Sequence, residues 1–258
     1  MSAREQFTSQ FLVKPNEYSS FKKIVAVMSG KGGVGKSLVT SLTAIALQNK
    51  GYKVGILDGD ITGPSIARIF GLTDPLLAGD EGILPAVSRS GIEIVSTNLL
   101  LENPGQPIIW RSPMITSIIK QFYSECAWGD LDYLLIDMPP GTGDVPLTVF
   151  QSFPVDGVIV VSTPQDLVGM IVEKSINMAK AMEVPMVGLV ENMSYVICDD
   201  CGKKIYPFGH NDNAKDFGID TIVELPINAD FARACDNGQL EMIEVKELEP
   251  LIASIEKL

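Results

Sequence analysis

The sequence predicts an α/β fold with a mostly parallel central sheet and helices on both faces. Short, almost continuous apolar runs alternate with longer segments of helical periodicity, a pattern typical of parallel strands buried on both sides. A glycine-rich loop joins the first apolar run to the first helical segment. At 258 residues the chain can bury one large core, so a single domain is expected.

The elements follow one another without an internal repeat or an inter-domain linker. Residues 1–21 are mixed and polar and are predicted to form an N-terminal arm or a frayed helix, whereas residues 22–258 are predicted to form the domain. The apolar runs predict strands at 24–28, 53–57, 92–96, 133–137, 158–162, 186–190 and 221–225. The helical patterns predict helices at 36–49, 115–127, 167–182, 229–236 and 247–257.

The most specific motif is the run Gly30-Lys31-Gly32-Gly33-Val34-Gly35-Lys36-Ser37, which fits G-x-x-x-x-G-K-[ST] with an extra lysine after the first glycine. A strand before it and a helix after it place bound phosphates at a helix N-terminus, where free N–H groups and the helix dipole favour negative charge. Lys36 is expected to reach the β and γ phosphates and Ser37 to ligate Mg²⁺. A chance glycine-rich turn is the alternative, which this context disfavours. The motif predicts a P-loop NTPase.

Acidic residues at two other strand ends are expected to complete the phosphate site. Asp137 ends the strand at 133–137 and is predicted to be the Walker B aspartate that holds the water shell of the metal. The proline- and glycine-rich segment 138–144 after it could sense the γ-phosphate. Asp58 and Asp60 follow the strand at 53–57, and we expect one to orient the attacking water and the other to support Mg²⁺. Capping of the next segment is the alternative for these carboxylates.

Composition restricts the possible partners and location. The net charge of -12 argues against unaided binding to nucleic acid or to an anionic membrane. No apolar run approaches the roughly 18 residues of a membrane span, and the N-terminus has no signal-peptide core. A cytoplasmic protein is therefore expected. Four cysteines do not make a disulfide scaffold in a chain of this size, so we expect them to be thiols or ligands.

Cys198-Asp199-Asp200-Cys201 lies in a turn-rich loop at about 194–209. Two thiolates at this spacing can hold one metal or one edge of a cluster, whereas a tetrahedral zinc site or a [4Fe-4S] cluster needs four ligands. A two-fold dimer would bring a second pair to the axis and complete the set. Taken alone, the motif also fits a zinc knuckle, a redox dithiol or a coincidence.

These motifs together carry a resemblance to a known family. The run Lys31 to Ser37 resembles the deviant Walker A motif of the MinD/ParA/nitrogenase-iron-protein class. The Mrp/ApbC branch of that class, the iron-sulfur cluster carrier ATPases, is similar in four further places: residues 58–65, Trp110-Arg111-Ser112-Pro113-Met114, residues 128–144 and the cysteine pair. The resemblance extends from about Phe21 to the C-terminus.

The resemblance implies an ATP-dependent homodimer that holds an iron-sulfur cluster between its subunits and delivers it to apo-proteins. It implies that Lys31 reaches the partner's nucleotide and that Asp60 is the hydrolytic carboxylate, with Asp58 beside it. It further implies that Asn192 contacts adenine and that the segment around Pro226 lines the base. A [4Fe-4S] cluster is the expected type, and [2Fe-2S] remains an alternative. The base pocket does not decide between ATP and GTP.

The chain departs from the family pattern inside the cysteine motif, where Asp199 and Asp200 replace a proline and a polar residue. Two acids between the ligands should make a cluster harder to reduce or more labile. Two other functions stay open. A MinD/ParA-like positioning ATPase would need a basic amphipathic tail or a basic surface, and neither is visible in the sequence. A zinc-stapled, nucleotide-dependent scaffold would carry no cluster.

Overall fold

The computed structural model describes residues 12–61, 63–100, 112–165, 170–209 and 218–258. Several sequence-based predictions fall outside these ranges. They concern most of the N-terminal arm, Thr62 within the segment 58–65, Trp110 and Arg111, and the start of the helix predicted at 167–182.

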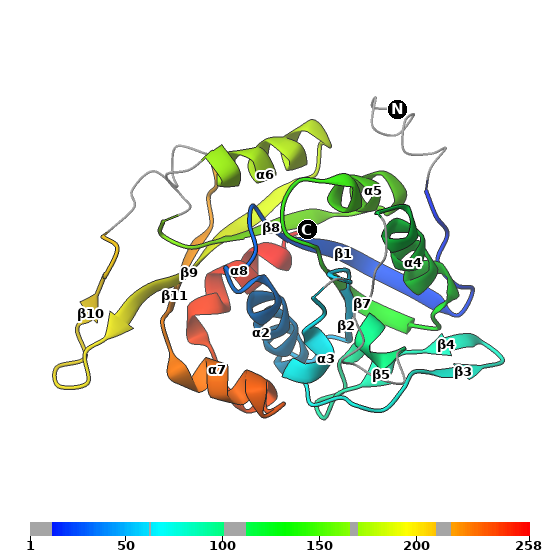
Figure 1. The fold of residues 1–258 in the computed structure, drawn as a ribbon, viewed down its shortest axis with the longest axis horizontal. Helices are drawn as coiled ribbons and strands as arrows, with labels where there is room; N and C mark the ends of the chain where they lie inside the picture. The colour runs from blue at the N-terminus through cyan, green and yellow to red at the C-terminus, as the bar shows by residue number, and fades with distance from the viewer. Residues whose placement is uncertain (1–11, 62, 101–111, 166–169, 210–217) are drawn as a thin grey trace.

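The described chain alternates strands and helices in the predicted manner (Figure 1). The strands are β1 (Ser19–Ser29), β2 (Val54–Asp58), β3 (Leu77–Gly79), β4 (Gly82–Leu84), β5 (Ala86–Val87), β6 (Glu93–Val95), β7 (Gly129–Asp137), β8 (Gly157–Ser162), β9 (Met186–Ile197), β10 (Lys204–Ile205) and β11 (Ile222–Pro226). The α-helices are α2 (Lys36–Asn49), α3 (Ile66–Ile69), α4 (Ser112–Glu125), α5 (Asp144–Ser152), α6 (Met170–Ala181), α7 (Ala229–Asp236) and α8 (Glu249–Ile255). Short 3₁₀ helices lie at η1 (Thr97–Leu99), η3 (Leu240–Met242) and η4 (Lys246–Leu248).

The central sheet is mostly parallel, which confirms the predicted fold class. Its strand order is β10-β9-β8-β1-β7-β2-β6-β5, and β11 pairs with β9. The long strands β1, β2, β7, β8, β9 and β11 all pair in parallel, whereas the short strands β5 and β10 pair antiparallel at the two ends. β3 and β4 form a separate hairpin.

Helices cover both faces of this sheet (Figure 1). Successive residues of β1 alternate between two cores: Ala26 belongs to the cluster with α4, α5 and α6, and Val27 to the cluster with α2, α3, α7 and α8. Both residues are fully buried. Burial on both sides explains why the strands appear in the sequence as continuous apolar runs.

The parallel register brings the predicted phosphate-site residues to one edge of the sheet. Asp58 at the end of β2 pairs with Asp137 at the end of β7, and Asp137 pairs in turn with Val27 of β1, three residues before Gly30. The carboxyl ends of neighbouring parallel strands meet at the same edge, where ligands of open α/β sheets bind.

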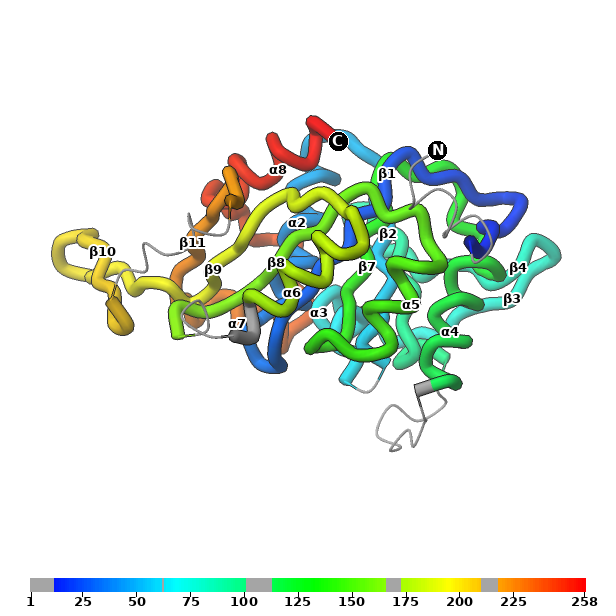
Figure 2. Tube along the Cα trace, turned by 90° about the horizontal axis from the view of Figure 1, so that it is seen from above, coloured from blue at the N-terminus to red at the C-terminus, as the bar shows by residue number. Residues whose placement is uncertain are grey.

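β9 is much longer than the strand predicted at 186–190. Beyond Glu191 it continues along β11 and then pairs with β10, so part of the predicted loop at 194–209 is a β-hairpin. The turn of this hairpin holds Cys198 and Cys201 and contains Gly202 at φ 70°. This cysteine hairpin (residues 194–209) projects from one end of the molecule, opposite the β3–β4 hairpin (Figures 1 and 2).

Other differences have local causes. α5 was not among the predicted helices. It begins at Asp144, the last residue of the proline- and glycine-rich segment 138–144, and Pro146 is accommodated because a proline is tolerated in the first turn of a helix. β1 begins five residues before the predicted strand because its N-terminal half pairs with β7 from Gly129 onward. The predicted helices at 36–49 and 229–236 are confirmed to the residue. None of the described helices has the length and hydropathy needed to cross a membrane.

Candidate phosphate site and cysteine hairpin

The glycine-rich loop between β1 and α2 has the shape of an anion cradle. Gly33 and Gly35 adopt φ values of 82° and 84°, which residues with a Cβ rarely take. No side chain caps the N-terminus of α2, so its first N–H groups face the loop. The loop lines a cavity of about 310 Å³ together with Asp60, Ser65 and Pro140. The residues present therefore fit a bound phosphate chain.

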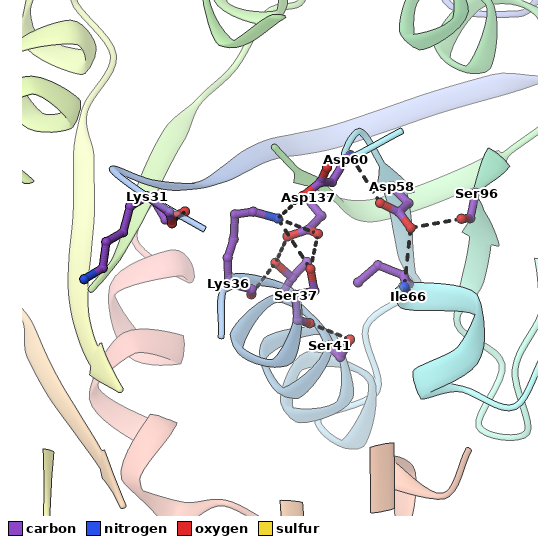
Figure 3. Close-up of polar contacts among 11 residues, drawn as sticks. Lys31, Lys36, Ser37, Ser41, Asp58, Asp60, Ile66, Ser96 and Asp137 are labelled. Carbon is purple, nitrogen blue, oxygen red and sulfur yellow. Dashed lines mark hydrogen bonds and ion pairs between the residues drawn. The ribbon is translucent and has the colours of Figure 1, made fainter. Parts of the chain in front are cut away.

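The side chains of Lys36, Ser37 and Asp137 form the centre of this site (Figure 3). Lys36 Nζ lies 2.7 Å from Asp137 Oδ2, and the Ser37 hydroxyl donates to the same oxygen at 2.6 Å. Asp137 is fully buried and Lys36 is 6% exposed. A hydroxyl and a carboxylate are the hard oxygen donors that Mg²⁺ prefers, so these two residues fit a metal held beside the phosphates.

Thr40 completes the surroundings of Asp137 and was missed from the sequence. Its hydroxyl donates to Asp137 Oδ1 at 2.7 Å, so both carboxylate oxygens are hydrogen-bonded. Thr40 lies three residues after Ser37 on α2, and residues at this spacing share a helix face. Helical periodicity could therefore have identified it.

Asp58 occupies a closed environment next to the centre. It is fully buried, and its Oδ2 accepts hydrogen bonds from Ser96 Oγ at 2.9 Å and from the Ile66 amide at 3.3 Å. Burial and the neighbouring Asp137 carboxylate raise the pKa of Asp58 well above its usual value, against the lowering effect of Lys36. Ser96 was not predicted, although it follows β6, which is paired with β2.

Asp60 differs from Asp58 in being open to the cavity. Its side chain is 17% exposed, lines the cavity, and places Oδ2 4.0 Å from Lys36 Nζ. The Asp60 amide donates to Asp58 Oδ1 at 3.3 Å, which couples the two acids through the backbone. Only a carboxylate in contact with the cavity can reach a water near the γ-phosphate, so this difference agrees with the predicted roles of Asp60 and Asp58. The roles themselves stay predictions.

Lys31 and Asn192 have different surroundings, one exposed and one buried. Lys31 is exposed and extends away from Lys36 and the carboxylates (Figure 3). Asn192 is buried, and its side-chain amide donates to Val34 O at 2.9 Å. It therefore supports the loop from the protein side. Pro226 is buried at the end of β11, opposite Tyr195 of β9. Contacts of Asn192 and Pro226 with the base stay predictions.

The turn of the cysteine hairpin has the geometry of a metal-binding knuckle. The Gly202 amide donates to Cys198 O at 2.8 Å, and the Cys198 amide donates to Lys203 O at 3.0 Å. The amides of Cys201 and Asp200 and the Cys201 thiol donate to Cys198 Sγ and hold the pKa of the Cys198 thiol below its usual value. Cys198 is half-buried and Cys201 is exposed, so both thiols can be reached from outside.

Among the described residues, no further potential metal ligand joins the two cysteines to make a group of three. Among the residues that the structure describes, no group of three or more His, Cys, Asp and Glu side chains could hold a metal ion. Two thiols do not fill the coordination sphere of zinc or of a cubane cluster. Within the described part of the chain, one subunit offers half of such a site.

Aromatic side chains that the sequence did not single out anchor the hairpin to the domain. The Tyr206 hydroxyl donates to Glu224 Oε2 of β11 at 2.9 Å, and the rings of Tyr195 and Tyr206 lie 5.7 Å apart. Lys204 Nζ lies 3.8 Å from the centre of the Tyr195 ring. These contacts join residues on both arms of the hairpin to β11, so the cysteine turn is held at its base.

Comparisons with known proteins place the chain in a family. The ParA family model, described as NUBPL iron-transfer P-loop NTPase, matches residues 20–257. A protein named iron-sulfur cluster carrier protein from Clostridium perfringens is 48% identical over 87% of this chain and 82% of its own length. One of the same name from Methanocaldococcus jannaschii is 45% identical over 85% of this chain and 78% of its own.

Two solved structures are similar to this chain. A nucleotide-binding protein from Archaeoglobus fulgidus in complex with ADP superposes with a TM-score of 0.81 at 42% identity, covering 95% of this chain and 96% of that one. The cell division ATPase MinD of Pyrococcus furiosus reaches a TM-score of 0.64 at 19% identity, covering 92% of this chain and 99% of its own. The second likeness concerns the fold alone.

Proposed function

This chain belongs to the ParA family of NUBPL iron-transfer P-loop NTPases, and from that premise we propose that it is an ATP-hydrolysing carrier of iron-sulfur clusters. The observation that carries the proposal is the cysteine hairpin: two accessible thiols, one with a lowered pKa, at the tip of a projecting turn. Thiolates are the ligands of such clusters. The relatives named iron-sulfur cluster carrier proteins support the same function.

Cluster binding would take place between two copies of the chain. One hairpin offers two thiolates, and a two-fold axis close to Cys201 would supply two more, which is the set required by a [4Fe-4S] cluster. The cluster is cargo in this scheme and passes to apo-proteins. Ligand counting supports the homodimer, and four thiolates fit a [4Fe-4S] cluster, the proposed type, as well as a [2Fe-2S] cluster.

The chemistry of ATP hydrolysis would use the residues around the loop. The backbone N–H groups of the loop and Lys36 would bind the phosphates, while Ser37 and Asp137 would hold Mg²⁺, which neutralises phosphate charge. Asp60, open to the cavity, would orient the attacking water. Lys31 extends outward, as is required of a lysine that contacts the nucleotide of a facing subunit. The ADP complex of the Archaeoglobus fulgidus protein supports nucleotide binding here.

The acidic composition of the chain bears on its partners. A net charge of -12 disfavours nucleic acid and anionic membranes as binding surfaces, so apo iron-sulfur proteins and a second copy are the proposed partners. A cytoplasmic location remains a prediction from composition. The positioning-ATPase alternative has only a likeness of fold to support it.

The test is anaerobic reconstitution of the reduced protein with iron and sulfide, followed by assays of iron, sulfide, zinc and visible absorption. We expect a cluster shared by two chains in the wild type, and its loss in Cys198→Ala. Cys235→Ala is the matched control, because Cys235 is half-buried on α7, away from the hairpin, and should leave the cluster content unchanged.

Two results would contradict the proposal. A full cluster content in Cys198→Ala would reject the ligand assignment. Zinc at one ion per two chains in protein purified without oxygen, with no iron taken up, would favour the zinc-stapled scaffold instead.

A further inference from the structure

One strand, β9, contacts the phosphate loop and also carries the cysteine turn. Asn192 in its middle donates to Val34 O of the loop at 2.9 Å. The strand ends at Ile197, directly before Cys198. Five residues, 193–197, therefore connect the loop contact to the first cysteine.

The strand loses one of its two neighbours at this contact. Its pairing with β8 ends at Ser162 and Glu191, whereas its pairing with β11, which begins at Leu189, continues to Tyr195 and is followed by the pairing with β10. Opposite β11, β9 advances four residues from Glu191 to Tyr195 while β11 advances two, from Glu224 to Pro226. This bulge separates the half of β9 buried in the sheet from the half that carries the hairpin.

Met193, at the bulge, has an unusual backbone conformation. Its φ is 58°, and Glu183 is the other residue besides glycine with positive φ in the described part of the chain. A long side chain rarely adopts this conformation, and such residues persist only where the surroundings over-determine them. The Ser194 hydroxyl, which donates to Glu191 O at 2.7 Å, closes the bulge across Met193.

The loop and the bulge are in direct contact. A Cβ placed on Gly35 would come within 2.2 Å of Asn192 Nδ2 and 3.9 Å of Met193 Cε. Asn192 therefore leaves no room beside Gly35, whereas Met193 Cε would lie at van der Waals distance from such a Cβ. Packed interiors transmit displacements, so a shift of Val34 or Gly35 must move Asn192.

We propose that Asn192 and Met193 form the mechanical link between the nucleotide site and the cysteines, with Met193 as the hinge that sets the orientation of the hairpin. Asn192 follows the loop through its hydrogen bond to Val34, and the Met193 bulge passes that movement to the hairpin half of β9. This inference rests on the proposed function, because it assigns the regulation of cluster binding to Asn192, the predicted base contact, and to Met193 beside it. Met193 is a positioning residue and touches neither phosphate nor cluster.

Met193→Gly is the variant that tests the hinge. Glycine adopts positive φ without strain, so the variant should fold, while the bulge loses both its conformational constraint and the Met193 side chain beside Gly35. Glu183→Gly is the matched control. It relieves a comparable conformation, φ 54°, in the turn between α6 and β9, away from both sites.

The measurement is the rate at which a thiol reagent modifies Cys198 and Cys201 in reduced apo-protein, without nucleotide and with saturating AMPPNP. All proteins carry Cys235→Ser. Because Cys126 is fully buried, Cys198 and Cys201 are then the thiols that the reagent reaches. The proteins are compared at equal oligomeric state, checked by size-exclusion chromatography. Nucleotide affinity and the unfolding temperature are measured in parallel. If Met193 had a purely structural role, its replacement would change these two quantities and not the effect of AMPPNP on thiol modification.

We expect AMPPNP to change the modification rate at least about fivefold in the wild type and in Glu183→Gly, the lower end of ordinary coupling between sites. In Met193→Gly the ratio should fall close to one at unchanged nucleotide affinity. A wild-type ratio retained by Met193→Gly, or a ratio of one in the wild type itself, would overturn the inference. Iron loading of the same preparations separates this inference from the proposed carrier function. If either overturning result is found but the cluster still forms normally, the link through Met193 is rejected and the carrier function stands.

Discussion

Lys36 Nζ lies 2.7 Å from Asp137 Oδ2, so the lysine expected to bind phosphate is paired with the aspartate expected to hold the metal. Both side chains are buried, and the pair satisfies charges that would otherwise be costly at this depth. When nucleotide binds, the negative phosphate chain would take the place of Asp137 beside Lys36. Mg²⁺ would take the place of Lys36 beside Asp137. The pair thus keeps the site assembled in the absence of nucleotide.

Replacing Lys36 should affect both turnover and stability. Lys36→Ala removes the cation next to Asp137, so we expect ATP turnover to fall at least about 100-fold and the free energy of unfolding to fall by about 3 kcal/mol. Phosphate release and urea denaturation measure the two effects. Cluster content after reconstitution should be unchanged, since the cysteine hairpin lies at another end of the sheet. Normal turnover would reject the phosphate-site assignment.

Two glycines of the loop offer a matched pair of substitutions. Gly33 and Gly35 have nearly the same positive φ, but a Cβ on Gly33 meets no atom within 4 Å, whereas one on Gly35 would come within 2.2 Å of Asn192 Nδ2. Gly33→Ala should therefore destabilise the protein by about 1 kcal/mol through backbone strain alone. Gly35→Ala should cost clearly more, because the buried Asn192 must move as well. Thermal unfolding without nucleotide measures both, and equal losses would contradict the close contact.

Stability should depend on pH through Glu191. Burial, and then the neighbouring Glu224, raise the pKa of Glu191 from 4.5 to about 7. Between these values the folded state holds a proton that the unfolded state has released, so the free energy of unfolding decreases as pH rises through this window and is level above it. Asp58 and Glu93, whose pKa values are also raised, contribute their own share of the slope. Glu191→Gln should therefore reduce the slope by the share of Glu191, and its free energy of unfolding should exceed that of the wild type by roughly 2 to 3 kcal/mol at pH 8.

Urea denaturation at several pH values between 4 and 8 provides the measurement. Glu81→Gln serves as the control, because Glu81 is exposed near the β3–β4 hairpin and should leave the slope as it is. A wild-type slope that persists in Glu191→Gln would assign the titration to another group.

The two acids of the cysteine turn should influence a bound cluster. Asp199 and Asp200 are exposed beside the ligands, and their negative charges oppose the addition of an electron. Asp199→Asn and Asp200→Asn should each raise the reduction potential of the reconstituted cluster, with a larger rise in the double variant. Redox titration followed by visible absorption gives the values. Asp74→Asn, an exposed acid between α3 and β3, should cause no shift.

Much of the phosphate site could be predicted from the sequence because its residues belong to short, continuous motifs. A glycine-rich loop between an apolar run and an amphipathic segment identified α2 to the residue, and an acid at a strand end identified Asp137. Thr40 and Ser96 were missed, although helical spacing and strand pairing would have found them. α5 was also missed, although Pro146 lies in its first turn, where a proline is compatible with a helix.

By itself the sequence determined the fold class, the anion-binding loop, the strand-end acids and the two thiols, because each depends on a spacing of a few residues along the chain. The tertiary structure alone decided which of two nearby acids is buried and which is open: Asp58 lies under Ser96 and Ile66, and Asp60 faces the cavity. It also decided that β9 runs past Asn192 to the cysteines. Burial and strand pairing arise from residues far apart in the chain, and no local pattern contains them.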